Sequence, residues 1–209
     1  MNKVWAVVVG LAWLGVLPGA RAADNTAPWR QKAAECEGCH GPGGDSTISS
    51  YPKLAGQNAS YLEQQLTDFK NGTRPDPVMS GMAAGLNPTD IGNISTFFAN
   101  QTMSPAGAQG SAGAGALGRT VYREGDRQRG VLACMGCHGP AGAGTPPYSP
   151  RIGGQWARYV QQQLLAFRNG TRRNDPSGMM RTIAAHMTRP EIVAVSQYVA
   201  GLGARPAHP

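Results

Sequence analysis

The chain has 209 residues and a formal net charge of +7; 41% of its residues are hydrophobic and 7% are aromatic. A basic chain is a candidate for nucleic-acid binding. A module that reads bases is not supported by so few aromatic residues, nor by the export signal at the start of the chain. We therefore expect no nucleic-acid partner. The length allows one or two domains.

The first 22 residues have the features of a cleaved secretory signal peptide. They contain Lys3, an apolar run from Trp5 to Leu17, and a closing Ala20-Arg21-Ala22 with small residues at alternate positions. A membrane anchor is the other interpretation, but the apolar run is shorter than the roughly 20 residues that a spanning helix needs. We therefore predict a signal peptide over residues 1–22 and a periplasmic mature chain.

The motif CEGCHGPGG, which starts at Cys36, is repeated as CMGCHGPAG from Cys134. Cysteines in an oxidising compartment suggest disulfides, but CxxC followed directly by histidine is the attachment signature of c-type haem. A zinc ribbon would bring its cysteine pairs much closer together, and a thioredoxin-like pair needs a βαβ context that is absent. We predict two covalently bound haem c groups. Their thioether links fall on Cys36, Cys39, Cys134 and Cys137, and their first iron ligands are His40 and His138.

Residues 56–74 are also repeated, at an offset of 98, as residues 154–172. A repeat of this kind indicates a duplication with two equivalent halves. The stretch between the halves is rich in Gly, Ala and Ser, which is typical of a linker. We predict a first domain over residues 23–103, a linker over 104–117 and a second domain over 118–209.

Apolar residues recur at helical spacing in both halves, and no strand pattern is present. We expect three helices per half. These are a leading helix (28–35, 117–123), a middle helix that stops at Asn71-Gly72 or Asn169-Gly170, and a final helix that starts at Asn87-Pro88 or Thr188-Arg189-Pro190. Three short helices can bury only a small hydrophobic core. A haem would complete that core, so the chain without haem is predicted to fold poorly.

The repeat also distinguishes among the seven methionines that follow the signal peptide. Only Met79 and Met180 occupy equivalent positions in both halves. We therefore predict them as the second iron ligands, with Met82 and Met179 as reserves. Core packing is the alternative role for a methionine, and His186 is a weaker candidate ligand.

A proline follows each histidine at the second position, at Pro42 and Pro140. Two interpretations are open for these residues. They form plain turns, or their carbonyl groups accept a hydrogen bond from the outer imidazole N–H and so raise the basicity of the ligand.

Charge is divided unevenly, with −3 over residues 23–103 and +8 over residues 104–209. Positive charge disfavours ferric iron, so the haem of the second half is predicted to have the higher potential. The arginines of that half also suit docking to an acidic partner.

Taken together, the two CxxCHGP clusters, YPKLAGQ and SPRIGGQ, the repeated YLEQQLTDFKNGTR, MSGM and NDPSGMMR resemble the dihaem cytochromes c4. The resemblance covers nearly the whole mature chain. It implies an all-α fold of two tandem class I cytochrome c domains, each wrapped around one covalently bound haem and related by a pseudo-two-fold axis. It also implies haem propionates near the interface, and iron ligation by His40 with Met79 and by His138 with Met180.

An iron with histidine and methionine ligands has no open position for a substrate. We therefore expect an electron carrier rather than an enzyme, and a dihaem peroxidase would need a vacant or displaceable ligand. The expected donor is a quinol-oxidising complex or a soluble protein, and the expected acceptor is a terminal oxidase or another redox protein. A monomer, compatible with peripheral contact to a membrane, is expected. The alternative is the dihaem subunit of a flavocytochrome that oxidises sulfide.

Overall fold

The structure is a computed structural model that describes residues 27–107 and 112–203, without the side chains of 112–114. The predicted signal peptide lies outside these residues. Within the two described ranges, no helix is long and apolar enough to cross a membrane.

Regular secondary structure in the described residues is helical, apart from two isolated bridges at Asp126–Val131 and Thr145–Ser149. The helices of the first half are α1 (Pro28–His40), the short 3-10 turn η1 (Pro42–Gly44), α2 (Ala59–Asn71), α3 (Met79–Ala84) and α4 (Pro88–Ala99). Those of the second half are α5 (Ala112–Arg123), α6 (Met135–His138), α7 (Ala157–Arg168), the 3-10 turn η2 (Pro176–Gly178), α8 (Met179–His186) and α9 (Arg189–Gly201). The all-α prediction is confirmed.

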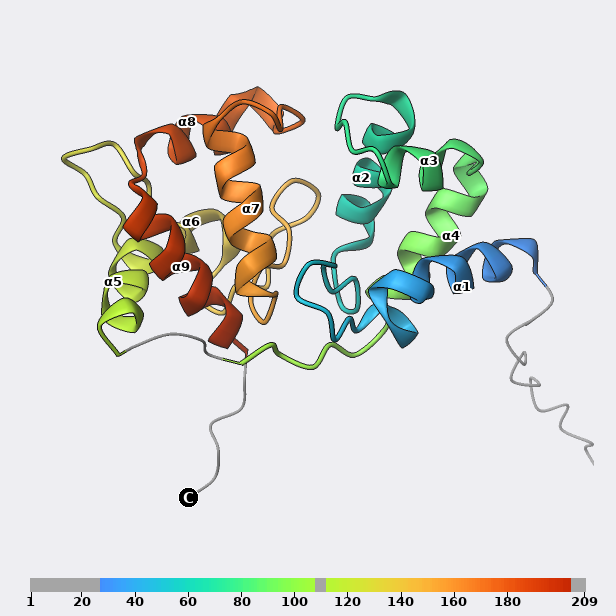
Figure 1. Ribbon diagram of the computed structural model, residues 1–209, viewed down its shortest axis with the longest axis horizontal. Coiled ribbons are helices and arrows are strands. Elements are labelled where there is room, and N and C mark those ends of the chain that lie inside the picture. The colour runs from blue at the N-terminus through green and yellow to red at the C-terminus, as the bar shows by residue number, and fades with distance from the viewer. Residues whose placement is uncertain (1–26, 108–111, 204–209) are drawn as a thin grey trace, which may run out of the picture.

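Each half packs around its own hydrophobic cluster, and the two groups of helices lie side by side (Figure 1). The first cluster centres on Ile94 and Phe98 of α4 with Ala33 of α1. The second centres on Tyr122 of α5 with Ile192 of α9. Helices α2 and α7 lie on the facing sides of the two groups, so the residues repeated in the sequence meet at the interface.

Local sequence accounts for where the final helices begin. Asn87 accepts a hydrogen bond from the Asp90 backbone, and the Asp90 carboxylate returns one to the Asn87 backbone, with Pro88 in the first turn. Thr188 and Glu191 form the same capping box before α9. Such boxes satisfy two of the free N–H groups at a helix start, and both predicted starts are confirmed.

The two leading helices differ from each other at the cysteine clusters. Helix α1 continues past its predicted end at residue 35, through the first cluster to His40. Helix α5 begins at Ala112, before its predicted start at 117, and ends at Arg123 as predicted, and a separate turn, α6, carries the second cluster. The cause is a loop after α5 in which Gly125 and Gly130 adopt φ values of 72° and 74°, a conformation that interrupts a helix and suits glycine. The structure also contains two short helices that were not predicted, α3, which begins at Met79, and α8, which begins at Met179.

Helices α5 and α9 cross at a glycine. A Cβ atom at Gly118 would lie 2.2 Å from the carbonyl oxygen of Ala194 on α9. The two backbones can approach this closely only because residue 118 has no side chain. Gly115, one turn earlier on α5, is exposed and has nothing within 4 Å of its Cβ position.

Substitution of these two glycines should therefore have opposite effects on stability. Gly118→Ala should lower the free energy of unfolding by about 1–3 kcal/mol, because the helices must separate. Gly115→Ala, the matched control on the same helix, should raise it by up to about 1 kcal/mol through helix propensity alone. Thermal unfolding of the haem-containing protein measures both; equal effects would contradict the close crossing.

Candidate haem sites and the interface between them

The first cluster occupies the last turns of α1. Cys36 is half-buried, Cys39 is exposed, and the His40 ring is buried. Residues three positions apart on a helix lie on the same face, so both thiols are presented to one side. Gly41, with a φ of 78°, ends the helix directly after the histidine.

The second cluster repeats this arrangement on the single turn α6. Cys134 is half-buried, Cys137 is exposed and His138 is buried, and Gly139 has a φ of 75°.

The first cysteine of each cluster has a raised pKa. Burial raises the pKa of the Cys134 thiol to about 11, and burial likewise raises the pKa of the Cys36 thiol to about 11. In the chain without haem these cysteines are therefore neutral thiols at physiological pH.

Each buried histidine is oriented by a proline carbonyl, but not by the prolines considered from the sequence. The Nδ1 atom of His40 lies 2.8 Å from the carbonyl oxygen of Pro52, and that of His138 lies 2.9 Å from the oxygen of Pro150. The interpretation of Pro42 and Pro140 as acceptors is wrong, because the chain turns away after Gly41 and Gly139 and returns to each ring twelve residues after the histidine.

This hydrogen bond determines which nitrogen is available for a metal. A carbonyl can only accept, so Nδ1 carries the proton and Nε2 keeps a free lone pair. Burial lowers the pKa of both histidines, and this effect outweighs the opposing influence of the carbonyl groups. Both rings are thus held in the neutral form that binds iron.

The methionines lie at helix starts. Met79 is the first residue of α3, where its backbone N–H donates to the Asp76 carboxylate at 2.8 Å. Met180 lies in the first turn of α8, whose start is held by Asp175 through the Arg181 N–H at 3.0 Å.

Exposure separates these methionines from the reserves. Met79 and Met180 are half-buried, whereas Met82 is 44% exposed and Met179 is 49% exposed. The donors in each half are therefore two thiols on one helical face, one imidazole with a free Nε2 and one half-buried thioether, and this set fits a c-type haem.

The interface between the halves is built from pairs of equivalent polar residues. Three pairs take part: Arg74 and Arg172, Gln65 and Gln163, and Tyr61 and Tyr159. Each arginine donates to both glutamine oxygens at 2.7–2.9 Å and to the tyrosine of the other half at 3.0 or 3.1 Å. Reciprocal contacts of this kind define an isologous interface about a pseudo-two-fold axis.

One acidic residue breaks the symmetry of this network. Asp68 of α2 is buried and accepts hydrogen bonds from Gln64, Thr73 and, across the interface, Asn174 at 2.6 Å. Alanine, Ala166, occupies the equivalent position in the second half. The first half therefore carries a buried acidic side chain at the interface that its copy lacks.

The interface residues were not identified as functional from the sequence, although a signal was present. Gln57, Tyr61, Gln65 and Arg74 are all identical in the repeat. Residues that face a pseudo-two-fold axis meet their own copies, so identity at polar positions in and beside the middle helix was the available indication.

Comparisons with known proteins agree with this architecture. A family model described as Cytochrome c matches residues 116–203. The cytochrome c4 of Azotobacter vinelandii is 40% identical over 97% of this chain and its full length. A thiosulfate dehydrogenase electron acceptor of Thiomonas intermedia is 37% identical, over 92% of this chain and 89% of that protein.

Among solved structures, the crystal structure of reduced recombinant cytochrome c4 from Pseudomonas stutzeri superposes with a TM-score of 0.78. The two are 36% identical, over 83% of this chain and 96% of that one. The 40% identity to the Azotobacter vinelandii protein over 97% of this chain shows the family. The chain belongs to the dihaem cytochrome c4 family, electron-transfer cytochromes with two covalently bound haem c groups.

Proposed function

We propose that the chain is an exported electron carrier in which each half is one haem domain, over residues 23–103 and 118–209. The observation that carries the proposal is the complete donor set in each half. Cys36 and Cys39 hold one haem covalently, and Cys134 and Cys137 hold the other. The axial ligand pairs are His40 with Met79 and His138 with Met180.

The bound haem supplies one-electron exchange at its iron. The protein keeps the ligand geometry constant while the charge changes. Both imidazoles are buried and fixed by a proline carbonyl, and both methionines lie in the first turn of a helix anchored by an aspartate. A site with both axial positions filled offers no place for a substrate, which suits outer-sphere transfer.

The interface favours transfer between the two haems within one chain. Arg74 and Arg172 place two guanidinium groups, each no more than 8% exposed, on either side of the axis. Buried positive charge favours a compensating anion. The haem propionates that the family resemblance puts near the interface would supply it.

We propose a periplasmic shuttle between a quinol-oxidising complex or soluble donor and a terminal oxidase. A monomer, compatible with peripheral contact to a membrane, is the form expected to act. The excess of arginine in the second half favours an acidic docking surface on the partner.

A second candidate is the electron-accepting partner of a sulfur-oxidising enzyme. The similarity to a thiosulfate dehydrogenase electron acceptor favours such an enzyme over the sulfide-oxidising flavocytochrome considered from the sequence. Rapid reduction of the protein by a purified thiosulfate dehydrogenase with thiosulfate would support this role. Reduction only by a quinol-oxidising complex would favour the shuttle.

Ligand substitutions test the axial assignment. Carbon monoxide binds only to ferrous haem with an open position, so the reduced wild-type protein should bind almost none. Met79→Leu and Met180→Leu should each open one site per chain, whereas Met82→Leu, the exposed control on α3, should open none. Carbon monoxide difference spectra count the sites; an open site in Met82→Leu but not in Met79→Leu would move the ligand to Met82.

The charge asymmetry predicts unequal potentials, with the haem of the second half higher. Asp68→Asn should raise the potential of the first haem more than that of the second. A differential field of about 1 kcal/mol corresponds to roughly 40 mV for one electron. Glu63→Gln, an exposed change of the same charge on the same helix, should have a smaller effect because solvent screens it. Potentiometric titration of the variants provides the test, and equal shifts from both substitutions would contradict the role of the buried acid.

A further inference from the structure

Two buried glutamines bind the backbone of the opposite half. The Gln155 side-chain oxygen accepts from the backbone N–H of Lys53 at 3.0 Å, and its amide nitrogen donates to the Lys53 carbonyl at 2.9 Å. Gln57 does the same to Arg151, at 2.7 and 2.8 Å. The glutamines are 5% and 8% exposed, so these bonds are shielded from water.

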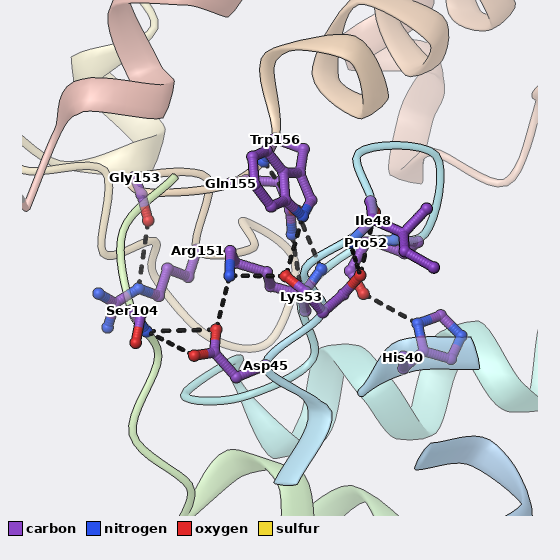
Figure 2. Close-up of polar contacts among 11 residues, drawn as sticks. His40, Asp45, Ile48, Pro52, Lys53, Ser104, Arg151, Gly153, Gln155 and Trp156 are labelled. Carbon is purple, nitrogen blue, oxygen red and sulfur yellow. Dashed lines mark hydrogen bonds and ion pairs between the residues drawn. The ribbon is translucent and has the colours of Figure 1, made fainter. Parts of the chain in front are cut away.

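The residues that they hold directly follow the prolines that orient the histidines. The N–H of Lys53 and the carbonyl of Pro52 belong to one peptide group, because residues 52 and 53 are consecutive. His40 donates to that carbonyl at 2.8 Å, and the N–H of the same group donates to Gln155 (Figure 2). His138, the Pro150–Arg151 peptide group and Gln57 form the equivalent chain.

A peptide group that donates through its N–H becomes a stronger acceptor at its carbonyl. Each bond in such a chain polarises the next, by about 10–30%. A stronger acceptor at Nδ1–H makes the imidazole a more basic iron ligand, which favours the ferric form. The glutamine also restrains the rotation of the peptide plane, and with it the direction of the carbonyl.

The first of these chains is further fixed by its surroundings. The Lys53 ammonium group binds Asp45 at 2.6 Å and the Ser46 carbonyl at 2.8 Å, and it lies 4.9 Å from the centre of the Trp156 ring. Trp156 donates to the same Ser46 carbonyl across the interface at 3.1 Å. The opposite half therefore holds Lys53 at two places, its backbone through Gln155 and its ammonium group through the Trp156 ring.

We infer that Gln155 is a positioning residue for His40 and Gln57 for His138, so that each haem potential depends on a side chain of the other half. The inference rests on the proposed ligation by the two histidines. Its distinguishing consequence is a crossed pattern, because a glutamine in one half should act on the haem of the other.

The test uses the full-length protein with both haems and the variants Gln155→Met and Gln57→Met, which remove the hydrogen bonds while keeping a similar volume. Tyr159→Phe is the matched control, because it removes one bond across the same interface without touching either chain. NMR of the reduced protein follows the two Nδ1–H resonances, and potentiometric titration with the two haems resolved gives both potentials.

In Gln155→Met, the His40 Nδ1–H resonance should move upfield and the potential of the first haem should rise, with smaller changes at the second. Gln57→Met should show the reverse assignment, and Tyr159→Phe should move neither resonance. If the methionine variants fail to fold, Gln155→Glu provides the test. It keeps an acceptor for the Lys53 N–H, and the His40 resonance alone should move downfield.

Shifts at the haem of the same half, or equal shifts at both haems, would overturn the inference. The wild-type titration separates this result from failure of the proposed function. Two reversible one-electron steps show that the carrier is intact, and their absence would contradict the carrier itself.

Discussion

The hydrogen bond between each buried imidazole and a proline carbonyl is the contact around which both halves are arranged. It selects the tautomer that leaves Nε2 free, and it operates in a site where burial has already lowered the pKa of the ring. The loop after each histidine must therefore return its proline to the ring before the next helix can start. In both halves that helix, α2 or α7, begins seven residues after the proline.

The segment that returns to each histidine also forms part of the interface between the halves. The residues that follow Pro52 and Pro150 run directly into the glutamines and then into the helices that face each other across the axis. Orientation of the histidines and association of the halves are thus achieved by one continuous segment in each domain. A duplication supplies such an interface at once, since one surface needs only to be complementary to itself. Differences between the halves are then visible as asymmetry, and the clearest case at the interface is Asp68, whose equivalent in the second half is Ala166.

Local chemistry made much of this structure predictable. The haem clusters follow from five adjacent residues, and the starts of α4 and α9 follow from capping boxes four residues long. The matched methionines needed only the repeat. Pro52 and Pro150 were missed as acceptors because their contact with the histidines depends on the path of a loop. Pro42 and Pro140, which are nearer in sequence, also offer a carbonyl group that could accept the hydrogen bond. The partners of Gln57 and Gln155 lie 94 and 102 positions away, a separation that no local pattern encodes. The different settings of the two clusters, one at the end of a long helix and the other on a separate turn, were not predicted, because the sequence does not reveal that Gly125 and Gly130 adopt positive φ values.

The account requires that both irons have one nitrogen and one sulfur ligand at once. The absorption spectrum of the ferric protein tests this most directly, because iron–sulfur ligation by methionine gives a weak band near the red end of the visible range. Measured per chain, that band should have twice the intensity found for a protein with one such haem, and no high-spin component should be present. A band of single intensity accompanied by a high-spin signal would show that one half lacks its methionine ligand, and would contradict the carrier proposed here.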